Sequence, residues 1–101
     1  MSLQKTLKAL GDPIRRDILE LLKNKTMTAT EIANQFYISA PAISRHLNVL
    51  KDADLIRMTR QGKYLVYELN ASVLEEVLIW ISSFETKKEK RYEREKDLKE
   101  C

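Results

Sequence analysis

Apolar residues return every three or four positions through the first half of the chain, a spacing that gathers them on one face of an α-helix. The pattern predicts a short helix over residues 2–10 and a second over about residues 13–23. Gly11-Asp12-Pro13 separates the two, because glycine suits the end of a helix and proline suits the first turn of the next. The chain therefore opens with two short helices and a tight connection.

Two further helices are predicted after residue 27. Thr28 and Glu31 have the spacing of a capping box, which opens a short helix. Ser39 is the expected N-cap of the next helix, whose apolar face carries Ile43, Leu47 and Leu50. The opposite face of that helix is polar. Two short helices joined by a tight turn, the second with a polar outer face, form the layout of a helix-turn-helix.

The pattern changes from helical to alternating at about residue 55. Residues 55–60 and 63–69 each alternate apolar and polar side chains, as half-buried strands do. Gln61-Gly62 lies between them and suits a tight hairpin turn, because glycine accepts a positive φ. Arg60 and Lys63 flank the turn, so the tip of the predicted hairpin is positively charged.

After the hairpin, Asn70-Ala71-Ser72 is expected to cap a last, long helix with a broad apolar face. The stripe could be core, yet one small domain has little surface with which to cover it, and this favours a dimer interface. From residue 87 nearly every side chain is charged, which predicts a solvated helical extension over residues 87–101. We therefore expect one domain over residues 1–86 followed by this extension.

Charge is distributed unevenly along the 101 residues. Residues 1–70 carry eleven Lys and Arg against seven Asp and Glu, whereas residues 71–86 carry three Glu and no base. The first two thirds of the chain therefore suits a polyanion such as double-stranded DNA. No apolar run long enough to cross a membrane and no signal peptide is recognised. The lone Cys101 forms no internal disulfide, so a cytoplasmic location is expected.

Nothing in the pattern favours an enzyme. No His/Asp/Ser or Cys/His set has a catalytic spacing, and Gly11 and Gly62 are the only glycines, which excludes a glycine-rich phosphate loop.

Three motifs in order resemble the ArsR/SmtB family of bacterial repressors. Residues 7–19 (LKALGDPIRRDIL) resemble the opening signature, residues 39–50 (SAPAISRHLNVL) the recognition helix, and Arg60-Gln61-Gly62-Lys63 with Tyr67 and Leu69 the wing. Within the family the chain most resembles the metal-free autorepressor branch typified by SdpR. The resemblance spans about residues 3–84. It implies a mainly α fold with a small β-hairpin, a winged helix-turn-helix of order α-α-α-α-β-β-α.

The family also implies a homodimer built on the first and last helices, with two recognition helices in successive major grooves of a palindromic operator. The expected DNA-contacting residues are Ser39, Ala40, Ala42, Ser44, Arg45, His46, Arg57, Arg60, Gln61 and Lys63. The expected dimer-interface residues are Leu3, Leu7, Val73, Val77, Trp80, Ile81 and Phe84.

Several of these side chains have a second interpretation. His46 ranks below Arg45 as a DNA contact, because it could be a packing residue or a contact that depends on its protonation. The basic side chains of the hairpin could be ordinary exposed charges. Arg15 or Arg16 is expected to pair with an acid such as Asp12 or Asp17.

The sequence departs from the metal-sensing relatives. When residues 39–47 are aligned with the recognition helix of those relatives, their two thiol positions fall on Thr28 and Thr30, and hydroxyls do not replace thiolates for soft metals. The last helix has no histidine for a zinc or nickel site, and the only histidine, His46, has no His or Cys nearby. We therefore expect no metal and no cofactor.

Taken together, the patterns and the resemblance predict a cytoplasmic, homodimeric, metal-independent transcriptional repressor. Two alternatives stay open. One is a winged-helix sensor of a small molecule or a thiol oxidant, with Cys101 as the thiol. The other is a winged-helix scaffold that binds a protein partner, because fold alone does not decide function.

Overall fold

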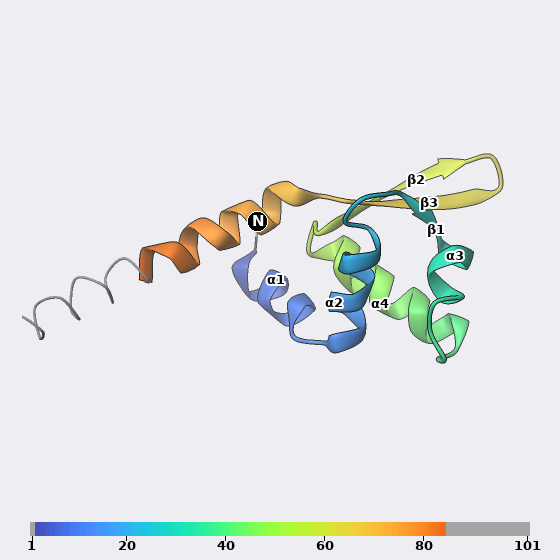
Figure 1. Ribbon diagram of the computed structural model, residues 1–101, viewed down its shortest axis with the longest axis horizontal. Helices are drawn as coiled ribbons and strands as arrows, with labels where there is room; N and C mark the ends of the chain where they lie inside the picture. The colour runs from blue at the N-terminus through green and yellow to red at the C-terminus, as the bar shows by residue number, and fades with distance from the viewer. Residues whose placement is uncertain (1, 85–101) are drawn as a thin grey trace, which may run out of the picture.

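The computed structural model describes residues 2–84, which form a helical body with a small antiparallel sheet (Figure 1). The elements in order are α1 (Leu3–Leu10), α2 (Pro13–Leu21), β1 (Met27–Thr28), α3 (Ala29–Ala33), α4 (Ala40–Asp52), β2 (Ile56–Gln61) and β3 (Tyr64–Leu69). Residues 71–84 then form a C-terminal helix. The predicted winged helix-turn-helix fold is confirmed, while the predicted extension over residues 87–101, with Cys101, lies outside the described residues.

Side chains satisfy the free backbone N–H groups at the helix starts, as the sequence predicts for α3 and α4. At α3 the Glu31 backbone N–H donates to Thr28 Oγ1 at 3.2 Å, and the Thr28 backbone N–H donates to Glu31 Oε1 at 2.9 Å. Ser39 Oγ accepts the backbone N–H of Ala42 at 3.2 Å at the start of α4. These caps fix where both helices of the helix-turn-helix begin.

The sheet has three strands in the order β1-β3-β2. The β2–β3 hairpin pairs from Ile56 opposite Leu69 to Gln61 opposite Tyr64, and Gly62 takes a φ of 62° in the turn, as expected. The two-residue strand β1, which pairs Met27 with Tyr67, was not predicted, because two residues are too few to show an alternating pattern. β1 holds the base of the hairpin against the chain segment that enters α3.

The core joins all the helices to the base of the hairpin. Its largest fully buried side chains, each at most 1% exposed, are Ile18, Ile32, Ile43, Leu47, Leu50, Leu55 and Ile56. After Ile56 every residue of β2 is exposed, so the hairpin projects beyond the core (Figure 1). The apolar face of α4 is therefore buried as predicted, and its polar face points away from the body.

The first helix meets the core through small side chains. Thr6 and Ala9 are both fully buried, and the Thr6 hydroxyl donates to the Ser2 carbonyl at 3.0 Å, so no polar group is left without a partner there. Leu7, one of the expected dimer-interface residues, is 42% exposed. This side of α1 is therefore not fully covered by the other described residues.

The junction between α4 and the hairpin is held by Asn70. The Leu55 N–H bonds to the Leu50 carbonyl at 3.0 Å, and Asp54 adopts a φ of 60°, which together close the end of α4. Asn70 Nδ2 donates to the Asp54 carbonyl at 2.7 Å. The sequence placed Asn70 in the cap of the last helix, whereas its side-chain amide here links the end of α4 to the base of the hairpin.

Candidate nucleic-acid interface

The N-terminal half of α4 presents small and polar side chains to solvent. Ser39, Ala40, Ser44 and Arg45 are exposed, and Ala42 is partly buried. Small side chains on a helix let its backbone come close to another surface, and an arginine can reach past them with a fork of donors that fits a base edge or a phosphate. Among residues 2–84 the ion pairs do not include Arg45, so its guanidinium is unneutralised.

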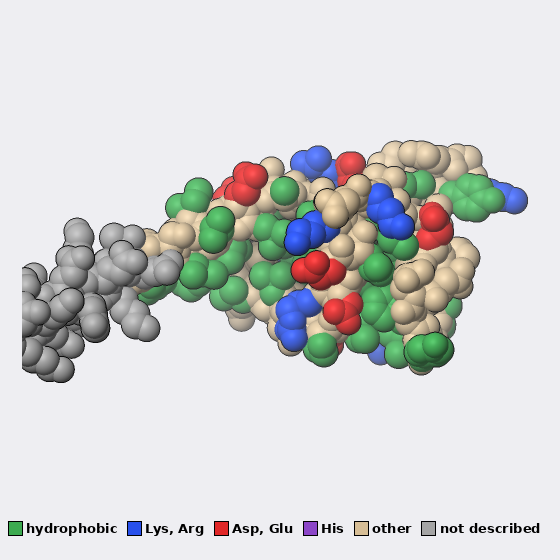
Figure 2. Space-filling model, in the orientation of Figure 1, with side chains coloured by type: hydrophobic (Ala, Val, Ile, Leu, Met, Phe, Trp, Pro, Cys, Tyr) green, Lys and Arg blue, Asp and Glu red, His purple; other side chains and the backbone are tan. Residues whose placement is uncertain are grey.

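The tip of the hairpin is the second basic element. Arg60, Gln61 and Lys63 are all exposed, and the Lys63 ammonium lies 5.5 Å from the centre of the Tyr64 ring. Figure 2 shows a basic side chain at the end of the projecting hairpin, beyond the body. No ion pair within the described part of the chain involves Arg60 or Lys63. The tip therefore carries two cations that are available to an external anion.

Arg57 differs from these cations. It stands at the base of the hairpin opposite Glu68, and its Nη2 donates to Asn70 Oδ1 at 3.2 Å. The hydrogen bond to the Asn70 amide orients its guanidinium toward the base of the hairpin. The structure therefore separates Arg57 from the basic tip, although the sequence grouped them.

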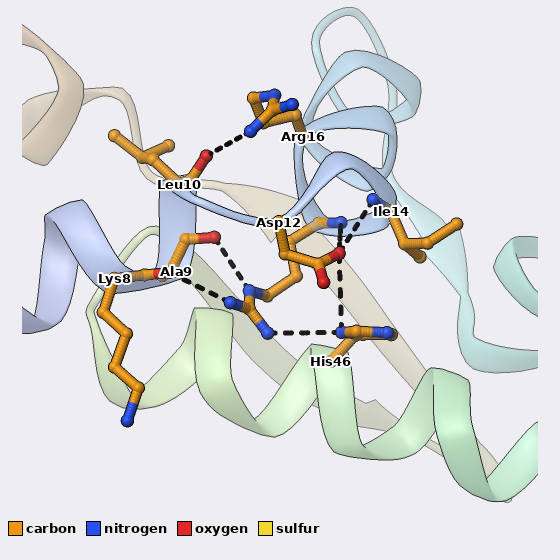
Figure 3. Close-up of polar contacts among 8 residues, drawn as sticks. Lys8, Ala9, Leu10, Asp12, Ile14, Arg16 and His46 are labelled. Atoms are coloured by element: carbon orange, nitrogen blue, oxygen red, sulfur yellow. Dashed lines mark hydrogen bonds and ion pairs between the residues drawn. The ribbon is translucent and has the colours of Figure 1, made fainter.

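His46 faces inward rather than outward (Figure 3). Its Nδ1 lies 3.4 Å from Arg15 Nη1 and 4.0 Å from Asp12 Oδ1, and only 20% of its side chain is exposed. Of the two interpretations of His46 above, the structure favours the packing one for this ring nitrogen. The other predicted residues of α4 remain on the solvent side.

Arg15 and Arg16 bind backbone carbonyls instead of acids. Arg15 Nε donates to the Ala9 carbonyl at 2.8 Å and its Nη2 to the Lys8 carbonyl at 2.9 Å. Arg16 Nη1 donates to the Leu10 carbonyl at 2.8 Å. The expected ion pair with Asp12 or Asp17 is therefore wrong, because both guanidinium groups bind carbonyls at the end of α1, where the Lys8 carbonyl also accepts the Gly11 N–H at 3.1 Å.

Asp12 caps α2, and its carboxylate is the acid of this region. Its Oδ1 accepts the backbone N–H groups of Ile14 at 2.8 Å and Arg15 at 3.2 Å. Burial acts to raise the pKa of Asp12, but these hydrogen bonds and the charges of His46 and Arg15 outweigh it, and the net pKa lies below its usual value. The carboxylate therefore stays ionised and fixed in place.

Thr28 and Thr30, the two positions considered above for thiol ligands, carry hydroxyl groups that lie in different surroundings. The Thr28 hydroxyl accepts the Glu31 N–H as part of the cap, and Thr30 lines a shallow hollow between α3 and α4. Within residues 2–84 no group of three or more His, Cys, Asp and Glu side chains is placed to hold a metal ion.

The other end of the molecule exposes apolar side chains. Val73 and Val77 of the C-terminal helix are at most 6% exposed, so the chain itself covers them. Beyond them lies an exposed apolar face, defined as Trp80, Ile81 and Phe84, whose side chains are between 42% and 56% exposed. Leu78 and Ile79 are also exposed, around the same turn of the helix. Trp80 and Phe84 pack edge to face, with ring centres 5.1 Å apart. Figure 2 shows these hydrophobic side chains gathered along the helix that runs away from the body.

Two exposed aromatic side chains near the basic surface were not singled out from the sequence. Tyr37, in the turn before α4, is fully exposed, and Tyr64 beside the hairpin tip is 52% exposed. A signal for them was present in the sequence, because each is an aromatic residue at a position that the helical or alternating pattern does not place in the core.

Comparisons with known proteins agree with this geometry. The profile of a helix-turn-helix domain family matches residues 10–59. The transcriptional repressor SdpR of Bacillus subtilis (strain 168) is 49% identical over 77 residues, which cover 76% of this chain and 86% of SdpR. An arsenical resistance operon repressor of Staphylococcus aureus is 32% identical over 72 residues, covering 71% and 69% of the two chains.

Solved structures give the same result. An ArsR family transcriptional regulator of known crystal structure superimposes with a TM-score of 0.81 at 28% identity, over 86% of this chain and 90% of that one. In the part of the chain that the structure describes, no helix is long and apolar enough to cross a membrane.

Proposed function

We propose that this member of the ArsR/SmtB family is a homodimeric, metal-independent repressor that binds a palindromic operator. The chain belongs to that family of winged helix-turn-helix transcriptional regulators, which bind DNA and are not enzymes. The observation that carries the proposal is the pairing of two unneutralised basic elements. One element is Arg45 on α4, and the other is the hairpin tip with Arg60 and Lys63. All three side chains are exposed, and none forms an ion pair with an acid of the described residues. We also propose that the protein is located in the cytoplasm, where it has access to DNA.

Recognition divides between the two elements. α4 enters the major groove, where Arg45 reads a base edge, and the small residues Ala40, Ala42 and Ser44 allow close approach. The hairpin lies against the adjacent backbone, where Arg60, Gln61 and Lys63 bind phosphates or the minor groove. Arg57, which is tied to Asn70, contributes less than the tip.

The dimer follows from the exposed apolar face. Contiguous apolar patches of more than a few hundred Å² are unusual on monomers. A two-fold pair would bury Trp80, Ile81 and Phe84 together with Leu3 and Leu7 of α1, which Figure 1 places at the same end of the molecule. Val73 and Val77 are already buried within the chain, so they would hold the C-terminal helix in place rather than contact the second copy. The same symmetry would set two copies of α4 about 34 Å apart, one turn of DNA.

Metal independence rests on the chemistry of the donor set. Thr28 and Thr30 supply hydroxyls where relatives use thiolates, and the Thr28 oxygen already serves as a cap. A stoichiometric addition of zinc, cadmium or arsenite should leave operator affinity unchanged, both for the wild type and for Cys101→Ser. Release of DNA by one of these metals in the wild type would overturn this part of the proposal.

A salt titration of DNA binding tests the function itself. The duplex from upstream of the protein's own coding sequence is compared with a shuffled duplex of the same length and composition. We expect preferential binding to the first, and a loss of affinity for both as salt rises, because each phosphate contact releases counterions. We place the operator in this upstream region, so equal affinity for the two duplexes at every upstream position tested would contradict the proposed function. Absence of any salt dependence would contradict DNA binding through the basic surface.

A further inference from the structure

We propose that Asp12, Arg15 and His46 form a positioning cluster that holds the recognition helix against the first helix, so that operator affinity depends on a contact that does not touch DNA. The proposal rests on the proposed function and extends it. It concerns how the reading helix is oriented, and it gives His46 a role different from that of a DNA contact.

Arg15 joins three helices with one side chain. It belongs to α2, its Nε and Nη2 reach the Ala9 and Lys8 carbonyls at the end of α1 at 2.8 Å and 2.9 Å, and its Nη1 lies 3.4 Å from His46 Nδ1 on α4. A guanidinium holds its donors in a rigid plane, so fixing two of them on α1 directs the third. The position of His46 relative to α1 is thereby constrained.

Asp12 completes the cluster from the turn between α1 and α2. Its Oδ1 is held by two backbone N–H groups and lies 4.0 Å from His46 Nδ1. The negative charge of the Asp12 carboxylate offsets the positive charge of Arg15 beside the largely buried His46 ring. The acid, the guanidinium and the ring are thus packed together at the crossing of α1, α2 and α4.

The ring has no charged neighbour on its own helix. The positions three and four residues away are Ala42, Ile43, Val49 and Leu50, so the polar partners of His46 all come from the α1–α2 region. The Lys8 ammonium points away from the ring, and only the Lys8 carbonyl takes part (Figure 3). Nδ1 can accept from Arg15 only in the neutral imidazole that carries its proton on Nε2. The contact between Arg15 Nη1 and His46 Nδ1 is thus a hydrogen bond in the tautomer whose Nδ1 carries no proton.

The cluster links α1, which we place in the dimer interface, to α4, which we place on DNA. α1 carries exposed Leu7, and α4 carries exposed Arg45. A link between these helices sets how the reading face is oriented relative to the two-fold axis. A small misorientation of two helices that must enter successive grooves weakens specific binding more than non-specific binding, because only base contacts need that geometry.

A double-mutant cycle on DNA affinity tests the proposal. Affinity for the upstream duplex and for its shuffled counterpart is measured for every protein in the same buffer and at the same salt concentration. The variants are Arg15→Gln, His46→Leu and the two combined. We expect each single variant to weaken operator binding about tenfold, and the double variant to be no weaker than either single one. Affinity for the shuffled duplex should change by less than about twofold.

Matched variants separate positioning from other roles. Arg16→Gln removes the same charge from α2 and a hydrogen bond to an α1 carbonyl, but not a contact with His46, so it should bind the operator like the wild type. His46→Asn keeps an acceptor near the Nδ1 position and should restore most of the affinity that His46→Leu loses. Thermal unfolding confirms that each variant is folded at the assay temperature. If Arg15→Gln is not folded, Arg15→Lys replaces it, since lysine keeps the charge but lacks the fork.

The outcomes are distinct. Additive losses of about a hundredfold in the double variant, or an Arg15→Gln protein that binds like the wild type, would overturn the positioning cluster. A His46→Asn protein as weak as His46→Leu, with Arg15→Gln unaffected, would assign His46 to direct DNA contact. A wild type that does not distinguish the two duplexes would refute the proposed function, and the positioning cluster with it.

Discussion

The two ends of the molecule are both exposed, but their chemistry is opposite. At one end α4 and the hairpin tip present Arg45, Arg60 and Lys63, charges that water solvates at little cost. At the other end the C-terminal helix presents Trp80, 42% exposed, and Ile79, 70% exposed, which water does not favour. Each Å² of apolar surface left wet forgoes roughly 25 cal/mol. The first end is therefore suited to a polyanion and the second to an apolar partner, for which we propose a second copy of the chain.

The core explains why the two ends can serve different partners. Val73 anchors the C-terminal helix in the same buried cluster that holds Ile43 and Leu47 of α4. Both exposed surfaces are thus connected through one buried core. A change at either end should alter one partner contact directly and the other only through geometry.

The largest effect is expected from Trp80→Glu. A carboxylate on the exposed apolar face would have to be buried without a partner in the dimer, which costs several kcal/mol. We expect a monomeric protein that has lost operator binding although Arg45 and the hairpin are unchanged. Sedimentation velocity measures the first effect and a gel-shift titration the second. Trp80→Phe keeps an aromatic ring and should remain a dimer. A Trp80→Glu protein that stays dimeric would remove this surface from the interface.

Arg45→Ala sharpens the comparison at the opposite end. If the guanidinium makes a bidentate base contact, its loss should weaken operator binding by about 1–3 kcal/mol and relax the preference for the base that it reads. The oligomeric state should not change. Lys51→Ala, in the last turn of the same helix, is the matched control and should have little effect. Unchanged operator affinity of Arg45→Ala would mean that another face of α4 reads DNA.

Thr28→Ala tests the stability of the fold rather than a partner contact at either end of the molecule. Loss of the cap on α3 should lower the free energy of unfolding by about 1 kcal/mol, as measured by chemical denaturation. The ratio of operator affinity to shuffled-DNA affinity should be unchanged. A changed ratio would show that α3 takes part in reading the sequence.

The same cap predicts an acid dependence of stability. Hydrogen bonds from the Thr28 backbone N–H and hydroxyl lower the pKa of Glu31 below the ordinary glutamate value of 4.5. A carboxyl with a lowered folded-state pKa stabilises the fold above pH 4.5, and this contribution is lost as the pH falls through the folded-state value. Glu31→Gln should therefore show a shallower loss of stability below that pH than the wild type.

Lys63→Ala should have the smallest effect. A lysine that binds a phosphate contributes to all DNA about equally, so both duplexes should lose affinity by a similar factor. The slope of log affinity against log salt should fall by about one. An effect confined to the operator would indicate that the hairpin tip reads bases.

The sequence predicted the elements whose signals are local. α4 and the hairpin followed from periodicity, and the caps at Thr28 and Ser39 followed from side chains next to the groups they satisfy. The fold class and the polar face of α4 could therefore be predicted before any coordinates.

What the sequence did not predict depends on contacts between distant residues. Arg15 and His46 are separated by 31 positions, and no periodic pattern records that they meet. β1 exists because Met27 pairs with Tyr67 on β3, and two residues carry no alternation of their own. Asn70 had the composition of a helix cap, yet its amide reaches the Asp54 carbonyl across the junction. Long-range partners of polar side chains are set by packing, so they become visible only in the folded chain.

The most direct test of the account is analytical ultracentrifugation of the wild-type protein, alone and with its upstream duplex, at micromolar concentration. The account predicts a folded dimer in the absence of DNA and a complex of two chains on one duplex, because the exposed apolar face and the basic residues of α4 and the hairpin tip lie at opposite ends of one domain. A folded monomer that binds the duplex as a single chain would contradict the dimer, the half-site geometry and the assignment of the two ends.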